Sequence, residues 1–384
     1  MSRKVLFTAS TYSHIRHFHL PYLQAFQEKG WEVHVACGDA PECIPGADRS
    51  ICLDFKKQMF SPRNFLAAWQ LRKVIKKERY ALITTHTSLA AFFTRLAVMG
   101  LRNRPRVVNM AHGYLFDDDT NKLKKLLLLT AERMTARVTD LLLTMNDWDY
   151  ATAQKYRLGK QVANVPGIGV DFAKLQRPDR ERSLAMRREL GIPEDAFALI
   201  YAAEFSARKS QSVLIEALAE LPETVYLLLP GQGVLLAECQ EQARALGVEK
   251  RVLFPGYVHD MPLWYGMADA AVSASRSEGL PFNIMEAMYF GLPVVASAVK
   301  GHTDLIKDGE TGLLYPYGDS AACAAAIRRL TADSEMRACV ASNAKEAMAP
   351  YDLAQVLPNV MGQYEGTISL SERVAINGDK TGQI

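Results

Sequence analysis

Residues 270–297, "AAVSASRSEGLPFNIMEAMYFGLPVVAS", decide the fold class. An apolar run ends near Ser275, a loop follows, and residues 282–290 show a helical pattern before the next apolar run. A strand, a helix and a strand at this spacing form a parallel βαβ unit. Glu278 then lies in the loop at the carboxyl end of the first strand, where open α/β sheets bind their ligands.

Similar units fill the rest of the chain. Apolar runs and helical stretches alternate from "KVLFTA" to "DLLLTMN", and again from "FALIYAA" to "TGLLYP". The segment "NVPGIGVDFAKLQRPDRERS" between them is rich in Gly, Pro and charge, as linkers are. We therefore predict two Rossmann-like, doubly wound α/β domains with the site in the cleft between them. Their expected bounds are 1–170 and 185–348, followed by a helix crossing back to the first domain over 349–366 and a tail over 367–384.

Length and composition are typical of a soluble two-domain protein of 384 residues. No apolar run reaches the roughly 18–20 residues that cross a bilayer. The start, "MSRKVLFTAS", lacks the long apolar stretch of a secretory signal. The six cysteines form no CxxC pair or zinc-type spacing, so we expect reduced, mostly buried thiols. Together these features predict a cytoplasmic protein.

Charge is spread unevenly along the chain. Residues 1–165 carry 25 Lys and Arg against 14 Asp and Glu, a net +11, whereas the remainder carries −8. The segment "NKLKKLLLLTAERMTARVTD", residues 121–140, joins a run of four leucines, residues 126–129, to five basic residues. A basic amphipathic helix can lie on an anionic membrane, so we predict peripheral membrane contact here. The alternatives are a solvated basic surface and burial of residues 126–129 in the core. We predict no nucleic-acid partner.

Residues 277–316 resemble the donor-site signature of retaining glycosyltransferases of family four, which have the GT-B fold. The signature is Glu-x7-Glu, then "GLPVVA", then "GHTDLI" and "GLL", and every part is present in order. The resemblance spans about residues 4–366 and implies transfer of a sugar from a nucleotide diphosphate sugar. By position, Glu286 would hold the ribose hydroxyls and Glu278 a hydroxyl of the donor sugar. Main-chain N–H groups at a helix start favour phosphates, and here they would come from Gly279, Leu280 and Phe282. Pro281, which has no N–H, belongs to the same expected donor-binding turn.

The loop in "AAEFSARKSQS", residues 202–212, follows another predicted strand. Lys209 matches the family lysine that stabilises charge on the leaving diphosphate. The usual arginine position holds Glu204, which departs from the family, and Arg208 is the candidate for the second positive charge. Glu204 either positions Lys209 or forms a structural ion pair. The resemblance further implies that main-chain atoms near Tyr257 and Val258 contact the base.

Histidines mark the expected site in the first domain. His112 follows a strand and matches the family histidine that faces the donor sugar and supports charge at the anomeric carbon. His86 follows another strand and resembles a position near the cleft. The stretch "TASTYSHIRHFHLPYLQAF", residues 8–26, resembles a bacterial subgroup that builds capsular polysaccharides and exopolysaccharides. We consider His14, Arg16 and His17, together with His86, as acceptor-binding candidates, and the alternative for residues 14–17 is a solvated helix start.

No metal ion or cofactor is expected. The alternation of histidines in residues 14–19 does not suit a zinc site, and no acidic ligand is evident nearby. The run Asp117, Asp118 and Asp119 lies in the loop after His112, and we interpret it as a solvated loop.

These patterns together predict a retaining glycosyltransferase that moves a sugar, with UDP-sugar the expected donor, to a lipid-linked glycan in surface polysaccharide biosynthesis. Its expected location is the cytoplasm, with peripheral binding at the inner face of the plasma membrane. Three alternatives remain open at this point. They are a nucleotide-sugar 2-epimerase of the same architecture, a pyridoxal phosphate-dependent phosphorylase, and a non-catalytic sugar-nucleotide-binding subunit, which Glu204 favours.

Overall fold

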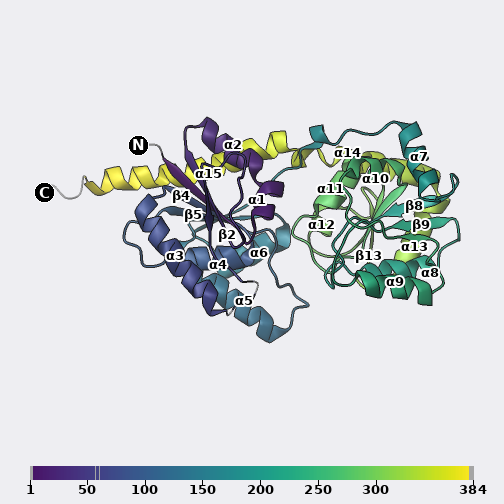
Figure 1. Ribbon diagram of the computed structural model, residues 1–384, viewed down its shortest axis with the longest axis horizontal. Helices are drawn as coiled ribbons and strands as arrows, with labels where there is room; N and C mark the ends of the chain where they lie inside the picture. The colour runs from purple at the N-terminus through teal and green to yellow at the C-terminus, as the bar shows by residue number, and fades with distance from the viewer. Residues whose placement is uncertain (1–2, 57, 60, 380–384) are drawn as a thin grey trace. The chain divides into compact units, whose positions relative to one another are not determined.

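The computed structural model describes residues 3–56, 58–59 and 61–379, with side chains up to Ser369. The chain forms two compact units, each built on one parallel sheet covered by helices (Figure 1). One unit combines residues up to Gly169 with those from Ala354 onward, and the other comprises Val170–Leu353.

The N-terminal unit contains a seven-stranded parallel sheet in the order β3-β2-β1-β4-β5-β6-β7. The central strands are buried almost throughout because most of their side chains are apolar, and the buried threonines Thr84 and Thr85 form hydrogen bonds. The strands are β1 (Lys4–Thr8), β2 (Glu32–Cys37), β3 (Arg49–Cys52), β4 (Leu82–Thr85), β5 (Arg106–Met110), β6 (Leu141–Thr144) and β7 (Gln161–Asn164). Its helices are α1 (Tyr12–Phe18), α2 (Leu20–Glu28), α3 (Pro62–Glu78), α4 (Ser88–Val98), α5 (Lys122–Thr135), η1 (Ala136–Val138) and α6 (Asp147–Tyr156).

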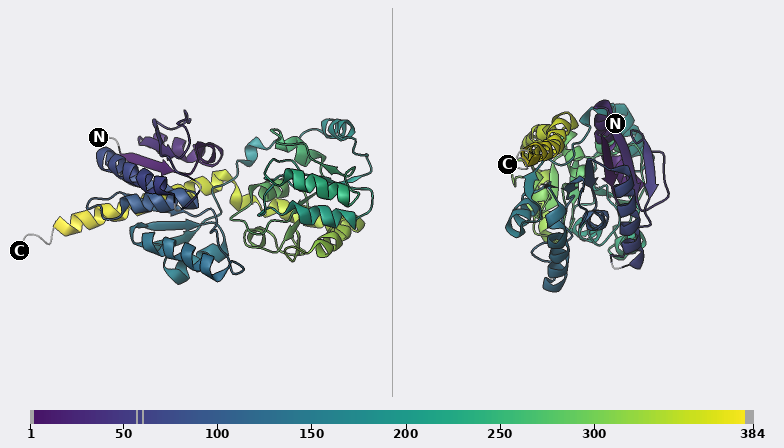
Figure 2. Two further views of the ribbon diagram at one scale, coloured as in Figure 1. Left: turned by 60° about the horizontal axis from the view of Figure 1, so that its bottom comes forward. Right: turned by 90° about the vertical axis from the view of Figure 1, so that its left-hand side faces the viewer.

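The last helix, α15 (Leu353–Asp379), packs on the N-terminal unit (Figure 2). The hydroxyl of Tyr364 lies 3.2 Å from Thr84 Oγ1, and its ring contacts the ring of Phe26. The helix continues past residue 366, where we predicted a tail, because Thr367 and Ile368 still bury their side chains.

The second unit contains a six-stranded parallel sheet in the order β10-β9-β8-β11-β12-β13. Its strands are β8 (Phe197–Ile200), β9 (Val225–Leu228), β10 (Val252–Leu253), β11 (Ala270–Ser273), β12 (Val294–Ser297) and β13 (Leu313–Tyr315). Its helices are η2 (Phe172–Lys174), α7 (Arg180–Glu189), α8 (Gln211–Ala219), α9 (Leu236–Ala245), α10 (Met261–Met267), α11 (Phe282–Tyr289), α12 (His302–Leu305), α13 (Ser320–Ala332), α14 (Ser334–Glu346) and η3 (Ala349–Tyr351).

The strand order of each sheet reverses beside its first strand. β1 lies between β2 and β4, and β8 lies between β9 and β11. Loops that leave such a point at the carboxyl end of the strands diverge and create a binding crevice. The loops after β8 and β11, and those after β1, β4 and β5, therefore position the candidate site residues.

The cysteines depart in part from expectation. All six are free thiols, but only half of them are buried. The others lie in a loop, at the end of the edge strand β3 and on the exposed face of α14. The buried thiols are Cys37, Cys239 and Cys323, and the exposed thiols are Cys43, Cys52 and Cys339.

Candidate functional site

Glu278 is a buried carboxylate in the second unit and the centre of an ion cluster, which Arg208 reaches from the surface. Its Oε1 accepts hydrogen bonds from Lys209 Nζ and Ser275 Oγ, each at 2.5 Å. Its Oε2 accepts one from Arg208 Nη1 at 2.8 Å. The loops after β8 and β11 supply these groups because the two strands are neighbours in the sheet. With three donors, the carboxylate can be buried without the cost of an unpaired charge.

The two cations set the charge of Glu278. Burial alone would raise the pKa of Glu278, but Lys209 and Arg208 outweigh it and hold the pKa at about 2. Burial lowers the pKa of Lys209, and Glu278 opposes that change. The two oppositely charged side chains therefore stabilise each other's ionised forms.

Glu286 has a different environment. It projects from the second turn of α11, half-buried, and its Oε2 accepts a hydrogen bond from the Tyr265 hydroxyl at 2.9 Å. Burial raises the pKa of Glu286 to about 7, although the hydrogen bond from Tyr265 lowers it. Glu286 therefore changes its charge near neutral pH, whereas Glu278 stays ionised.

A side-chain hydrogen bond links the start of α11 to the loop after β8. Asn283 Nδ2 donates a hydrogen bond to the carbonyl of Ala202 at 3.0 Å. Pro281 is the N-cap residue and precedes the first turn. Gly279, Leu280 and Phe282 complete this turn between Glu278 and the helix, which brings the helix N-terminus next to the ion cluster.

Glu204 does not pair with Lys209. It is exposed, and among the described residues its carboxylate forms no ion pair. The loop that carries it lies against Gly231 and Gly233. A Cβ added to Gly231 would lie 2.0 Å from the carbonyl oxygen of Ala203, so only glycine permits this approach.

Two further residues, His302 and Gly301, lie close to Glu278. The buried ring of His302 contacts Ser273 Oγ at 3.0 Å and the carbonyl of Ser297 at 2.8 Å. Gly301 has φ +83° and faces Glu278 directly. The sequence reasoning assigned no role to His302, Gly301 or Ser275, although the two former lie within the recognised "GHTDLI" element.

We expect Gly301→Ala to destabilise the second unit by about 1–3 kcal/mol and to weaken donor binding. An added Cβ would lie 2.7 Å from Glu278 Cβ and 2.9 Å from its carbonyl group, and alanine disfavours this φ. Thermal unfolding measures the effect. The control is Gly309→Ala, because Gly309 has φ +77° but open space around it. Equal losses in both variants would show that contact with Glu278 contributes nothing.

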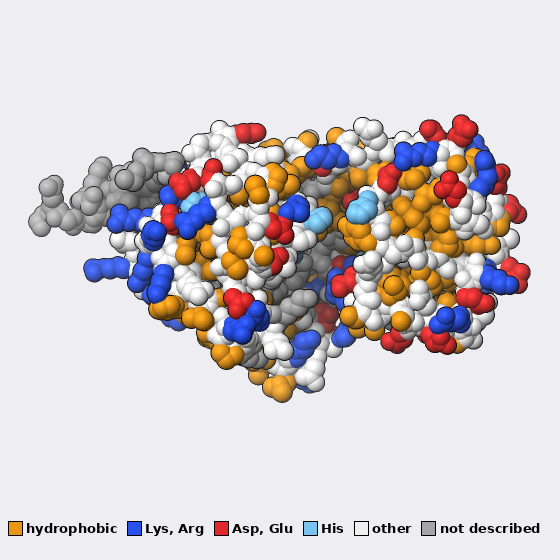
Figure 3. All heavy atoms as spheres, in the orientation of Figure 1, with side chains coloured by type: hydrophobic (Ala, Val, Ile, Leu, Met, Phe, Trp, Pro, Cys, Tyr) orange, Lys and Arg blue, Asp and Glu red, His pale blue; other side chains and the backbone are white. Residues whose placement is uncertain are grey.

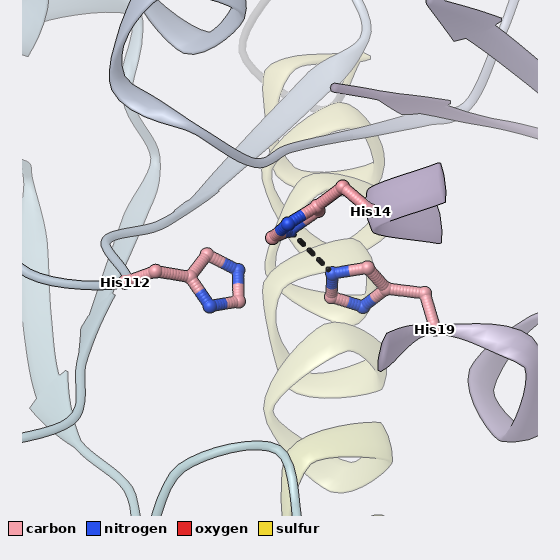
Figure 4. A group of neighbouring side chains, drawn as sticks. All are labelled: His14, His19 and His112. Atoms are coloured by element: carbon pink, nitrogen blue, oxygen red, sulfur yellow. Dashed lines mark hydrogen bonds between the residues drawn. The ribbon is translucent and has the colours of Figure 1, made fainter. Parts of the chain in front are cut away.

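Four histidines gather in the N-terminal unit. His14 on α1 and His19 at the start of α2 approach with 3.3 Å between their Nε2 atoms. His112, after β5, has its Nε2 3.3 Å from His86 Nδ1, and His86 Nε2 lies 3.1 Å from the Thr84 hydroxyl oxygen. Figure 4 shows His14, His19 and His112 turned toward one another. His19, for which we had predicted no role, is thus a central member of the cluster.

The cluster is neutral at physiological pH. Burial lowers the pKa of His14 to about 4, and it lowers the pKa values of His19, His86 and His112 well below their usual range. Each ring also resists protonation of its neighbours because two positive imidazoles would repel.

Arg16 and His17 lie outside this cluster. Both are exposed on α1, where Arg16 forms an ion pair with Glu42 and His17 Nδ1 lies 2.7 Å from the carbonyl of Ser13. The side chain of Thr11 caps α1 by accepting a hydrogen bond from His14 N–H. The structure therefore brings His14 together with His86 and His112, but not the other two acceptor-binding candidates.

Comparison with known proteins assigns the chain to a family. The family described as "Glycosyl transferases group 1" matches residues 183–347, and "Glycosyl transferase 4-like" matches residues 4–146. "Putative glycosyltransferase EpsD" of Bacillus subtilis is 34% identical over 335 residues, which cover 86% of this chain and 88% of that protein. This chain is a group 1 glycosyltransferase. A second relative is the "UDP-Gal:alpha-D-GlcNAc-diphosphoundecaprenol alpha-1,3-galactosyltransferase" of Escherichia coli, 27% identical over 272 residues, covering 68% of this chain and 69% of the relative.

Solved structures confirm the predicted GT-B fold of this group 1 glycosyltransferase. Anabaena HepE in complex with UDP and glucose has a TM-score of 0.79, at 22% identity over 95% of this chain and 100% of HepE. Sucrose-phosphate synthase from Thermosynechococcus elongatus has a TM-score of 0.80, at 21% identity over 96% of this chain and all of the other. Within the residues that the structure describes, no helix combines the length and apolar character that a membrane span requires.

Proposed function

We propose that this glycosyltransferase moves a sugar from a nucleotide diphosphate sugar to a glycan acceptor and retains the configuration of the anomeric carbon. The observation that carries the proposal is the buried carboxylate of Glu278, which pairs with the largely buried Lys209 and the half-exposed Arg208 beside the start of α11. A sugar diphosphate offers hydroxyl donors for the carboxylate and phosphate oxygens for the two cations.

Each side chain has a distinct part in this reaction. Glu278 accepts a hydrogen bond from a hydroxyl of the donor sugar, and Glu286 accepts those of the ribose. Main-chain atoms near Tyr257 and Val258 contact the base. Lys209 and Arg208 stabilise charge on the departing diphosphate together with the main-chain N–H groups of Gly279, Leu280 and Phe282. No metal ion or cofactor is required for these roles.

The histidines of the N-terminal unit are assigned the remaining roles in the proposed reaction. Neutral His112 can exchange a hydrogen bond with the donor sugar without repelling positive charge at the anomeric carbon. The leaving phosphate takes the proton of the acceptor hydroxyl on the same face, which retains the configuration. His14 and His86 lie beside His112 and are proposed to contribute to binding of the acceptor.

A thermal-shift screen of UDP- and GDP-sugars tests the donor. We expect UDP-sugars to raise the Tm, because a ligand that binds only the folded state stabilises it, by about 2.7 kcal/mol at 100 times its Kd. HepE binds UDP and UDP-glucose in its solved structures, which supports this choice. No shift with any nucleotide sugar would contradict the proposal, and a shift with GDP-sugars alone would contradict the UDP assignment.

We further propose a lipid-linked glycan as acceptor, in assembly of a surface polysaccharide in the cytoplasm. The support is the Escherichia coli relative, whose name specifies a sugar on diphosphoundecaprenol. Such an acceptor lies at the inner face of the plasma membrane, so the enzyme has to work at that surface.

Helices α3 and α5 of the N-terminal unit fit such a surface. Both pack against α4 and expose large apolar side chains, while Leu129 of α5 faces the core. Lys73 lies over the Trp69 ring at 3.3 Å, and further Lys and Arg side chains gather over α3 (Figure 3). Apolar side chains next to cations suit the interface of an anionic bilayer. The exposed apolar residues are Phe65, Leu66 and Trp69 on α3 and Leu123, Leu126, Leu127 and Met134 on α5.

We expect the protein to sediment with vesicles that contain phosphatidylglycerol at low salt, and not with pure phosphatidylcholine. Leu123→Glu with Leu126→Glu should lower vesicle binding at least about tenfold, because two apolar contacts are lost and two negative charges are added. Val234→Glu is the matched control, since Val234 is 90% exposed in the other unit. Wild-type protein that ignores anionic vesicles at low salt would contradict membrane contact.

One observation favours a second function. Glu204 stands where the family usually has an arginine, and its exposed carboxylate would repel a diphosphate. A non-catalytic subunit that only binds sugar nucleotides would therefore bind the donor without transfer to any lipid-linked acceptor. Arg208, which reaches Glu278, offers a replacement charge, so we favour the enzyme.

A further inference from the structure

Three imidazole rings from separate segments converge in the N-terminal unit. His14 comes from α1, His19 from the start of α2, and His112 from the loop after β5. Each offers one ring nitrogen, and the three nitrogens lie within 4.8 Å of one another (Figure 4). A close set of nitrogens on three rigid segments is what a metal site needs before the ion arrives.

The distances suit a four-coordinate ion. Two nitrogens that are each about 2.0–2.1 Å from a tetrahedral centre lie about 3.3 Å apart. The Nε2 atoms of His14 and His19 have this separation. The ring of His112 meets the ring of His14 at 90°, with 4.9 Å between their centroids. The nitrogen of His112 lies within 4.8 Å of the other two, so its ring has to move closer to complete the geometry of a bound ion.

The protonation state also suits metal binding. A ligating imidazole must be neutral, and protons compete with a metal for the ring nitrogen. Burial keeps all three rings in the neutral form near pH 7. A fourth imidazole, His86, borders the set, with its Nδ1 3.3 Å from His112 Nε2.

The other group with ligand-type spacing in the described chain is already neutralised. It comprises Glu32, His34 and Glu78. Lys4 Nζ lies 3.0 Å from Glu32 Oε1 and 2.8 Å from Glu78 Oε2, so a cation of the protein itself holds the place of an ion. Among the described residues, no Lys or Arg side chain takes the place of an ion between the three nitrogens of the histidine set.

We propose that His14, His19 and His112 bind a borderline transition-metal ion such as Zn²⁺ through three imidazole nitrogens, with one position open. The sequence pattern argued against zinc because the alternation of the histidines in residues 14–19 does not suit a zinc site and no acidic ligand is evident nearby. The tertiary structure adds His112 from the loop after β5, about a hundred residues later. The inference rests on the N-terminal unit alone and is independent of the proposed transfer reaction.

A bound ion would interfere with the proposed transfer reaction. The proposed reaction requires the ring of His112 to face a sugar, and a bound ion would occupy that ring. The metal is therefore expected to compete with substrate and to act as an inhibitor rather than a cofactor.

Calorimetric titration of the full-length protein with Zn²⁺ tests the site. We expect one ion per wild-type chain and no binding of Mg²⁺, which prefers oxygen ligands. His14→Gln and His19→Ala should each weaken the affinity for Zn²⁺ at least about tenfold. His17→Ala is the matched control, since His17 is an exposed histidine of the same helix and should keep the wild-type affinity.

Thermal unfolding separates loss of the site from loss of the fold. His19 is buried, so His19→Ala can lower the Tm by itself, whereas the half-buried His14 tolerates glutamine more easily. Zn²⁺ should raise the Tm of the wild type and of His17→Ala, but not that of His14→Gln. Failure of the wild type to bind Zn²⁺ would overturn the proposal, as would equal affinity in all three histidine variants.

Discussion

Replacement of Lys209 with alanine is expected to lower kcat at least about a hundredfold, the order of magnitude for loss of one preorganised group that stabilises transition-state charge. Lys209 is nine-tenths withdrawn from solvent and lies within hydrogen-bond distance of Glu278, so water cannot replace it readily. The measurement is steady-state release of UDP with the donor found in the screen and an extracted lipid-linked acceptor.

The stability of this variant needs a separate control. Without Lys209, the buried Glu278 keeps Arg208 and Ser275 as partners, and its charge is less well compensated. Assays should therefore be run well below the Tm of the variant. Lys307→Ala serves as the matched substitution, because Lys307 is a surface lysine of the same unit. A folded Lys209→Ala protein with near-wild-type kcat would remove Lys209 from the mechanism.

Donor affinity is expected to rise with pH through about 7, the pKa to which burial raises Glu286. The ribose hydroxyls donate to an ionised carboxylate, and a protonated Glu286 has lost part of its accepting capacity. We expect the Kd for the donor to be about tenfold higher at pH 6 than at pH 8. A nucleotide sugar is a phosphodiester and has no phosphate group that titrates in this range, so the enzyme supplies the change.

Glu286→Gln tests this assignment. The amide imitates the protonated acid, so the variant should bind the donor weakly at every pH, with no step near pH 7. In the absence of donor, the free energy of unfolding of the wild type should fall as pH rises, whereas its affinity for the donor rises. The pKa of Glu286 is raised in the folded state, so its contribution to stability is complete below pH 4.5 and is lost as pH rises through about 7. The variant should therefore be more stable than the wild type at pH 8. An unchanged pH profile of the Kd in Glu286→Gln would contradict the role.

Much of the second unit could be predicted from local pattern. Apolar runs of strand length alternate with helical periods, and parallel sheets follow from that alternation because each crossover needs a helix. Glu278 and Glu286 were found by their places after a strand and within the next helix. The expected helix over 282–290 corresponds to α11 with a difference of one residue at its end.

The contacts of the site were not predictable in the same way. Lys209 and Glu278 are 69 positions apart, and they meet because β8 and β11 are adjacent in the sheet. The hydrogen bond from Tyr265 to Glu286 joins α10 to α11 and could not be read from the local sequence. In the sequence, nothing distinguishes His19 from the other polar residues of its stretch. In the fold, its ring is buried at the start of α2 and packs against the ring of His86.

The sequence by itself determined the two Rossmann-like sheets, the family and the positions of both glutamates, because these depend on short-range periodicity and on residues close together in the chain. Only the tertiary structure decided the charge states: Glu278 is ionised between Lys209 and Arg208, Glu286 titrates near neutral pH, and the histidine cluster is neutral. The physical reason is that a pKa depends on burial and on the nearest charges. Both are set by which loops the strand order brings together.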